Sequence, residues 1–440
     1  MATIDRAAAN RRWRPRRLAG RVLRPALILG LAAILVVAGA GLDRAGILPG
    51  AASADPADAS PQFQLIREAW NLLHEYDVQR AELNDTSLSY AAIAALANAI
   101  GDTGHTSFET PGDLASEQAV LDGHYVGIGV ALGPASGGAV LTAVYPGSPA
   151  SRAGLKVDDL IVAVNGRDVA GLALPNLIGL IAGPAGSSLT LTVRAAAGGG
   201  ARQIALIRGA VTIPVVIWAM VSGSRIADIQ IDQFSSGTTT ALVAALKSAH
   251  AEGAKGLVLD LRGNPGGLVA EAVGVASQFI ASGDVYQTQD ASGNRTGVPV
   301  QPGGVALETP LVVLVDHGTA SSAEIVASAL QDAHRATIVG ESTFGTGTIL
   351  GQFSLADGSA LRIGTEEWLT RNGRSIWHRS LAPDEIVALP RGEQPLTPSE
   401  LRGFPPAHLA AARDTQFRTA LHDAEQAVGV HLAAGRMTGR

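Results

Sequence analysis

The sequence PLVVLVDHGTASSAEIVASALQD at residues 310–332 joins an apolar run to an amphipathic run through a short polar turn. The first run is typical of a buried strand, and the apolar spacing after the turn is typical of a helix. IADIQI at 226–231 precedes a predicted helix at about 238–252, and GLVLDL at 256–261 precedes another at about 268–282. Strands that alternate with helices predict a layered α/β core with parallel strands.

The chain on either side of this core, which we place at residues 208–395, differs in composition. Residues 122–207 hold short β-rich runs between turns that contain Gly and Pro, and they predict an inserted β-rich domain. Apolar residues at helical spacing predict an N-terminal helical region at 62–121, and residues 396–440 predict a C-terminal helical tail. Residues 43–61 are rich in Ala and Pro and are typical of a linker.

The N-terminus predicts a membrane segment. Eight arginines lie between residues 6 and 24, and residues 25–42 carry no charge. Eighteen apolar residues at about 1.5 Å each span roughly 27 Å, enough for a bilayer core. The basic flank predicts a cytoplasmic segment at 1–24 and a single-pass anchor in the cell membrane, with the rest outside the cytoplasm. In the alternative, the Ala-Ser-Ala sequence at 52–54 is a signal-peptidase site and the protein is secreted.

Composition excludes several classes of function. The 440 residues carry a net charge of −6 and contain no cysteine. A nucleic-acid partner is not expected without a basic face, and disulfides, thiolate catalysis and Cys-based zinc sites are excluded. The histidines show no HExxH or comparable spacing, and GESTFGTGT at 340–348 lacks the Lys-Ser/Thr ending of a phosphate loop. We therefore expect no metal and no cofactor.

Two motifs in the β-rich segment resemble a PDZ domain of the circularly permuted kind found in bacterial proteases. They are YVGIGV at 125–130 and PGSPASRAGLKVDDLIVAVNGRDV at 146–169. The resemblance implies that the partners are proteins or peptides with free C-termini, captured by strand addition. The amides of Gly127, Ile128 and Gly129 would form a nest for the terminal carboxylate. The alternative is a glycine-containing β-turn without a ligand.

Three stretches of the core, in this order after a PDZ segment, resemble the C-terminal-processing, or tail-specific, serine peptidases. They are DLRGNPGG at 260–267, HGTASSAEIVASALQD at 317–332, and residues 339–386 from VGESTFGTGT onward. The resemblance covers about residues 62–425 and implies ATP-independent cleavage of peptide bonds with Ser321 as the nucleophile. A strand-to-helix turn suits that role, because helix-start amides lie nearby. Ser322 is the second candidate, and a mere helix cap completed by Glu324 is the alternative.

Acyl transfer also needs amide donors that face the developing oxyanion. The resemblance gives this role to the glycine-rich turn at 260–267. Gly266 can approach closely because it has no Cβ, and the amide of Ser322 is the natural second donor. The alternative is a tight strand–helix connection that needs glycine only for its turn.

The sequence departs from the family at the general base. Typical members use a lysine 25 residues after the serine, and that position is Thr346 here, with no lysine beyond Lys255. One explanation is a histidine base: His105, as in the tricorn-like relatives, or His378, with Glu366 or Glu367 fixing the tautomer. The other is an inactive homologue that binds C-termini as a scaffold.

The C-terminal segment also carries an expectation. Residues 405–433 contain DTQFRTAL, which is similar to the terminal DxQLxxA helix of the family. Related enzymes often dimerise through helical ends, so the resemblance implies a homodimer. Ordinary packing of this helix against the core is the alternative.

Overall fold

The computed structural model describes residues 61–102, 105–195, 200–212, 214–402 and 404–438. The basic segment, the apolar run at 25–42 and the Ala-Ser-Ala sequence lie outside the described residues, so the anchor and the signal site stay predictions. Within these ranges, none of the helices combines the length and the apolar character needed to traverse a bilayer.

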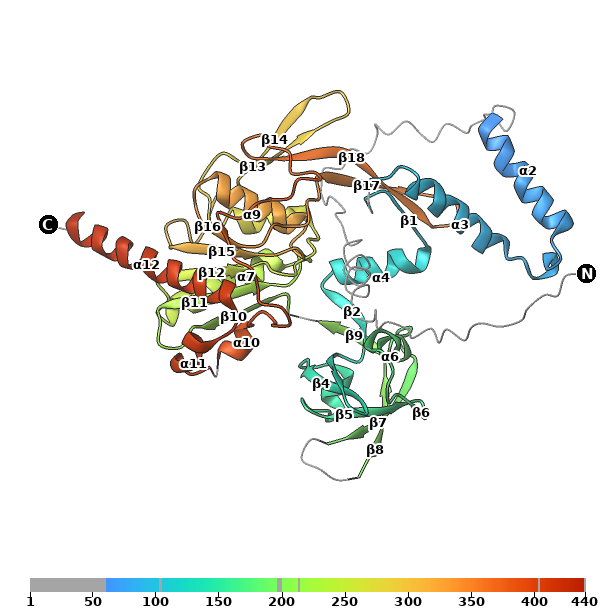
Figure 1. Cartoon of the computed structure of the whole chain (residues 1–440), viewed down its shortest axis with the longest axis horizontal. Coiled ribbons are helices and arrows are strands. Elements are labelled where there is room, and N and C mark those ends of the chain that lie inside the picture. The colour runs from blue at the N-terminus through green and yellow to red at the C-terminus, as the bar shows by residue number, and fades with distance from the viewer. Residues whose placement is uncertain (1–60, 103–104, 196–199, 213, 403, 439–440) are drawn as a thin grey trace, which may run out of the picture.

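A six-stranded sheet forms the centre of the peptidase core (Figure 1). Its central strands are parallel, and only the edge strand β10 runs antiparallel to its neighbour. Both faces are covered, so strands β12 and β15 are buried at every residue, as expected for parallel strands. The predicted layered α/β core is therefore confirmed. In sheet order the strands are β10 (Val216–Met220), β11 (Ile226–Ile231), β12 (Gly256–Asp260), β15 (Leu311–Val315), β16 (Thr337–Gly340) and β19 (Glu385–Ile386).

Helices cover the two faces of this sheet. One face packs on α7 (Thr238–Ala251), α8 (Val269–Ala276) and α9 (Ser322–Asp332), and the other on α10 (Pro398–Leu401) and α12 (Thr415–Thr438). A second, mostly antiparallel sheet closes the outer side of α8 and α9 through residues such as Trp368. Its strands are β1 (Ser107–Glu109), β13 (Asp284–Gln289), β14 (Arg295–Pro299), β17 (Thr348–Ser354) and β18 (Ala360–Thr370).

The β-rich segment forms a separate lobe below the core in Figure 1. Its main sheet has the order β3-β4-β5-β7-β8, with β6 paired to β5, and the lobe has its own apolar core. The ladder of β2 and β9 lies between the lobe and the peptidase core. Its elements are β2 (His124–Gly127), β3 (Val130–Ala135), β4 (Gly138–Val144), α5 (Pro149–Arg152), β5 (Leu160–Val164), β6 (Arg167–Asp168), α6 (Leu174–Ile181), β7 (Ser188–Arg194), β8 (Arg202–Ile207) and β9 (Gly209–Thr212).

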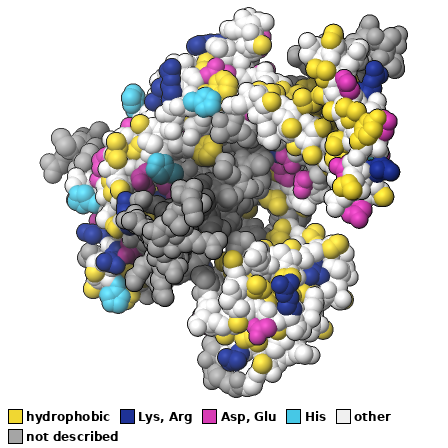
Figure 2. Space-filling model, turned by 45° about the vertical axis from the view of Figure 1, so that its right-hand side comes forward, with side chains coloured by type: hydrophobic (Ala, Val, Ile, Leu, Met, Phe, Trp, Pro, Cys, Tyr) yellow, Lys and Arg dark blue, Asp and Glu magenta, His cyan; other side chains and the backbone are white. Residues whose placement is uncertain are grey.

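The N-terminal region is helical, as α2 (Pro61–Tyr76), the short η2 (Arg80–Glu82), α3 (Asp85–Asn98) and α4 (Pro111–Leu121) show. None of the residues of α2 is buried. Figure 2 shows hydrophobic side chains gathered on the upper right, where α2 and α3 stand apart from the core. The last short helix, α11 (Pro406–Ala411), precedes α12.

Candidate active site

Two turns meet at one edge of the six-stranded sheet. The glycine turn, residues 260–267, begins at the last residue of β12. The serine turn, residues 316–321, follows β15. These strands are parallel neighbours, so their carboxyl ends lie at the same edge, where open α/β sheets place their ligands. The lysines lie elsewhere: Lys156 in the PDZ lobe, Lys247 on α7, and Lys255, which is exposed, before the amino end of β12.

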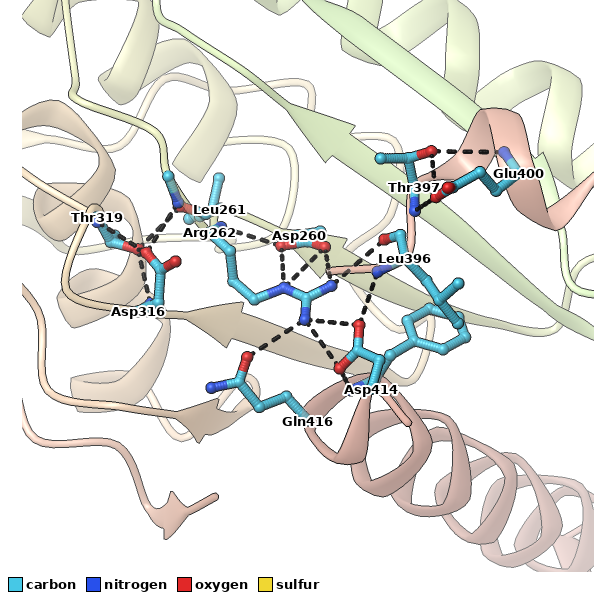
Figure 3. A network of polar contacts seen from close by, with 12 residues as sticks. Asp260, Leu261, Arg262, Asp316, Thr319, Leu396, Thr397, Glu400, Asp414 and Gln416 are labelled. Carbon is cyan, nitrogen blue, oxygen red and sulfur yellow. Dashed lines mark hydrogen bonds and ion pairs between the residues drawn. The ribbon is translucent and has the colours of Figure 1, made fainter. Parts of the chain in front are cut away.

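Hydrogen bonds join the two turns. The Gly263 amide donates to Asp316 Oδ1 at 2.8 Å, and the Thr319 hydroxyl donates to the Leu261 carbonyl at 2.8 Å (Figure 3). The Ser322 hydroxyl is buried and donates to the Gly267 carbonyl at 2.8 Å. Because Ser322 is engaged in this bond, it is a poorer candidate nucleophile than Ser321.

Ser321 has an unusual backbone. Its φ of 53° and ψ of −119° lie in a region that non-glycine residues rarely adopt. Such strain persists only where the surroundings impose it, and it is common at active sites. The residue is 2% exposed, so a peptide can reach its hydroxyl only if neighbouring segments move.

Thr346 occupies the position of the expected lysine. Its Oγ1 accepts a hydrogen bond of 2.6 Å from the Ser321 amide and donates one of 2.5 Å to Glu324 Oε2. Glu324 also accepts from the amides of Ser321, Gly345 and Thr346 and from the Thr343 hydroxyl. Thr346 therefore fixes the backbone of Ser321 and offers no base to its hydroxyl.

The carboxyl group of Glu324 is fully buried. Burial raises its pKa, and the hydrogen bonds that it accepts oppose this shift. The sequence suggested Glu324 only as a capping residue, whereas the structure makes it the centre of the network behind Ser321. A Ser-x-x-Glu spacing directly after the turn was the available signal.

The amide expected to be the oxyanion donor, that of Gly266, already has a hydrogen-bond partner. A Cβ added to Gly266 would lie 2.8 Å from Ser321 Cβ, so the glycine is required for close approach. Its amide, however, donates to Asn264 Oδ1 at 2.8 Å and is not free. Among the described residues, the amides of Gly267 and Ser322 make no hydrogen bond. The Gly266 amide is therefore engaged in this structure, and the oxyanion role of this glycine stays a prediction, with Gly267 as the other candidate.

His105 lies in the same neighbourhood. Its Nδ1 forms a hydrogen bond with the hydroxyl of Thr348, which begins β17 two residues after Thr346. Burial lowers the pKa of His105, so its imidazole is neutral near pH 7. If Nδ1 carries the proton, it donates the hydrogen bond to the Thr348 hydroxyl oxygen, and Nε2 is left as a proton acceptor.

The carboxylate near His105 differs from the expected one. Asp102, three residues upstream, raises the pKa of His105 against the larger effect of burial. Asp102 is held by the amide and the hydroxyl of Thr106. Glu366 lies on β18, paired with Ile349, and makes no hydrogen bond or ion pair with a histidine in the described chain. The orienting role expected of Glu366 is thus not supported, and Asp102 is the group that sequence reasoning missed.

His378 is exposed and lies above the loop that carries Thr346. Its amide donates to the Gly345 carbonyl at 3.3 Å, and its ring stacks on Trp377. A positive charge on His378 lowers the pKa of His105, so the two rings are close enough to interact. The structure therefore brings both predicted histidines near each other, in contact with Thr348 and Gly345 on either side of Thr346.

Arg262 ties the glycine turn to the C-terminal tail (Figure 3). Its guanidinium bonds to Asp260 Oδ2 at 2.6 Å and to Asp414 Oδ2 at 2.9 Å, and it also reaches Gln416 and the Leu396 carbonyl. Arg262 and its three side-chain partners are all buried. Bidentate, charge-assisted hydrogen bonds are stronger than neutral ones, so they fix the glycine turn against the C-terminal tail.

The PDZ turn at 127–129 is partly covered. A Cβ on Gly127 would lie 2.5 Å from Tyr125 Cε2, so the tyrosine ring packs over the glycine. Burial raises the pKa of the Tyr125 hydroxyl, and the amides of Gly129 and Val130 act against that shift. A carboxylate that binds here would therefore compete with this hydroxyl for the amides.

Comparison with known proteins agrees with this geometry. Residues 225–387 match the family model of Peptidase family S41, and residues 140–195 match that of the PDZ domain. A "Carboxyl-terminal-processing protease" from Synechocystis sp. is 32% identical over 358 residues, which are 80% of this chain and 80% of that protein. The chain belongs to peptidase family S41. This S41 peptidase is also 31% identical to "Carboxy-terminal processing protease CtpA" of Bacillus subtilis over 343 residues, 78% of this chain and 72% of the relative.

A solved structure is similar to this chain over most of the length of both proteins. It is "Photosystem II D1 C-terminal processing protease", with a TM-score of 0.45 and 29% identity, over 76% of this chain and 95% of that one. The family assignment rests on the sequence relatives. It makes the chain a serine-type peptidase with a PDZ domain, as the sequence motifs predicted.

Proposed function

We propose that this S41 peptidase is a membrane-anchored, extracytoplasmic endopeptidase that recognises protein C-termini through its PDZ domain and cleaves with Ser321. The observation that carries the proposal is the position of Ser321, strained and directly beside Gly266, at the edge where the glycine turn and the serine turn meet. The short basic and apolar segments at 1–42 support the location.

In the proposed mechanism, Ser321 Oγ attacks the peptide carbonyl while Nε2 of His105 takes the hydroxyl proton. The amides of Gly267 and Ser322 hold the negative oxygen of the tetrahedral intermediate. The protonated imidazole then gives its proton to the leaving amine, and water hydrolyses the acyl-enzyme with the same histidine as base. Thr348 keeps the ring in the required tautomer, and Asp102 stabilises its positive charge.

The PDZ lobe supports peptide capture by strand addition. Strand β3 is at the edge of its sheet and, in the part of the chain that the structure describes, pairs with β4 alone. Its other edge can accept an extended peptide beside α6, starting from the amides of Ile128 and Gly129. Ile128 directly before β3 and Leu177 on α6 are apolar core residues of the lobe, which supports an apolar C-terminus as the ligand.

The test compares the full-length wild type with Ser321→Ala on an unfolded protein that ends in an apolar residue. Wild type should cleave it, and the variant should not. Equal behaviour of the two would refute catalysis by Ser321. If both are inactive but bind tail peptides with equal affinity, the chain acts as a peptide-binding scaffold.

The base is tested separately. His105→Ala should lower kcat by about 100-fold to 10,000-fold, the usual contribution of a general base. His378→Ala is the matched control, because it removes a neighbouring imidazole that is exposed. If the loss follows His378→Ala and not His105→Ala, the roles are reversed.

We also propose that the chain forms homodimers. The exposed apolar residues Leu65 and Tyr76 of α2, at 65% and 70% exposure, support an interface at the helical N-terminal region. Light scattering on the detergent-solubilised chain tests this, and a monomeric mass at micromolar concentration would contradict it.

A further inference from the structure

A cavity lies between the PDZ lobe and the peptidase core. Its volume is 270 Å³, and its walls include Tyr125, Tyr145, Asp232, Gln233 and the apolar Val120 and Val215. The mechanism above uses none of these side chains.

The cavity lies on the path between the two parts of the proposed active site. Tyr125 is two residues before the PDZ turn, and the Tyr145 amide donates to the Gly129 carbonyl at 3.0 Å. On the other side, Asp232 and Gln233 lead directly to Phe234, whose amide donates to the Gly266 carbonyl at 2.8 Å. A peptide held at the PDZ turn that reaches Ser321 therefore passes this cavity.

Among the described residues, Asp232 is the only acidic one that lines the cavity, and it has no cationic partner there. In the described part of the chain it forms no ion pair, and burial raises its pKa to about 6. Two groups interact electrostatically with Asp232. Asp260 raises the pKa of Asp232 further, and Asp232 in turn raises the pKa of Tyr145. An uncompensated carboxylate at such a site costs stability, and a ligand that supplies the missing charge would remove this cost.

Gln233 adds a second unsatisfied group. Its Nε2 is buried and has no hydrogen-bond partner among the described residues. A peptide carbonyl oxygen would satisfy this donor. The aromatic walls suit the apolar stem of a long side chain, and their faces attract a cation.

We propose that this cavity is a specificity site for a lysine or arginine side chain of the substrate, with Asp232 as the counter-ion and Gln233 as a donor to the peptide backbone. The inference rests on the proposed function, because it assumes a peptide that spans the PDZ turn and Ser321. A free metal ion is a poor alternative, since one carboxylate and two phenols are too few oxygen ligands for a hard cation.

The test uses peptides with one apolar C-terminus in which a single lysine is moved through about ten upstream positions. Each has a matched peptide with norleucine, which keeps the stem and removes the charge. At one position the wild type should prefer lysine over norleucine in kcat/KM by about 10-fold or more, the range of a close charge pair. Asp232→Asn should bring this ratio to about one, whereas Glu252→Gln, an exposed charge on the far end of α7, should keep it.

No lysine preference at any position, or a preference that survives Asp232→Asn, would overturn the proposal. If the wild type cleaves none of the peptides, the proposed function fails instead. The cavity is then tested by binding. Fluorescence anisotropy gives the dissociation constants of the lysine and norleucine peptides for Ser321→Ala and for the double variant Ser321→Ala/Asp232→Asn. The first protein should prefer lysine at one position, and the double variant should not.

Discussion

The carboxyl group of Asp232 makes the stability of the peptidase core depend on pH in a predictable direction. Its pKa rises from 3.8 to about 6 on folding, chiefly because the group is buried. A carboxyl group with a raised pKa favours the folded state while it is protonated, and this contribution is lost as the pH rises from about 4 to 6. Above pH 7 the group is ionised in the folded state and lowers the free energy of unfolding by the full amount.

The magnitude follows from this shift. A rise of about two pH units at roughly 1.4 kcal/mol each gives a cost of about 3 kcal/mol at pH 7.5, and partial exposure of the carboxylate to water keeps it near or below that value. Asp232→Asn keeps the shape of the side chain and removes the charge. We therefore expect the variant to be more stable than wild type by up to about 3 kcal/mol at pH 7.5, and by less than about 1 kcal/mol at pH 4.

Urea unfolding at several pH values measures this difference. Tryptophan fluorescence is a suitable probe of the core, because two of the five tryptophans, Trp218 and Trp368, pack in it. The reasoning is refuted if the stability difference between the variant and wild type is the same at pH 4 and pH 7.5, or if the variant is the less stable protein at pH 7.5. A variant that gains stability but loses its preference for lysine substrates cannot owe that loss to misfolding.

Three further predictions concern the turns around the serine. Thr346→Lys restores the family spacing, so cleavage should rise with pH through the alkaline range as the lysine loses its proton; a flat pH–rate profile would argue against it. Asp414→Ala removes a buried acceptor from the Arg262 guanidinium and from the Leu396 and Phe417 amides, while Asp260 still pairs with Arg262, and it should destabilise the core by about 2–4 kcal/mol in urea unfolding; a difference under 1 kcal/mol would show that these buried bonds contribute little. Gly266→Ala places a methyl group 2.8 Å from Ser321 Cβ at a φ of +100°. We expect kcat to fall by about 100-fold or more, while the affinity for tail peptides stays constant. An unchanged kcat would mean that the backbone of the turn shifts to make room for the methyl group.

The core was predictable because its signals are local. The apolar runs of β12 and β15 predict the parallel sheet, and the glycines that follow each run predict the two turns to within a few residues. The second sheet was missed, since strands such as β13 and β14 are short and mixed in polarity, and β14 is largely exposed. The helix expected at 268–282 ends at Ala276, where the hydroxyl of Ser277 turns back to the Val273 carbonyl.

The candidate site was predictable only in part, because its remaining contacts join distant segments. Arg262 and Asp414 are 152 residues apart, and no periodicity in the sequence links them. The choice between Gly266 and Gly267 as amide donor depends on the side chain of Asn264, which sequence spacing does not reveal. Asp102 was overlooked because its effect on His105 depends on the fold of a short loop.

The bond between Arg262 and Asp414 has a consequence for biosynthesis. The ribosome makes the glycine turn long before it makes residue 414, so the guanidinium lacks its second carboxylate throughout most of translation. A nascent chain can therefore hold Ser321 and a folded PDZ lobe while the glycine turn still lacks its link to the C-terminal tail. The order of synthesis makes docking of α12 the last step that fixes this turn.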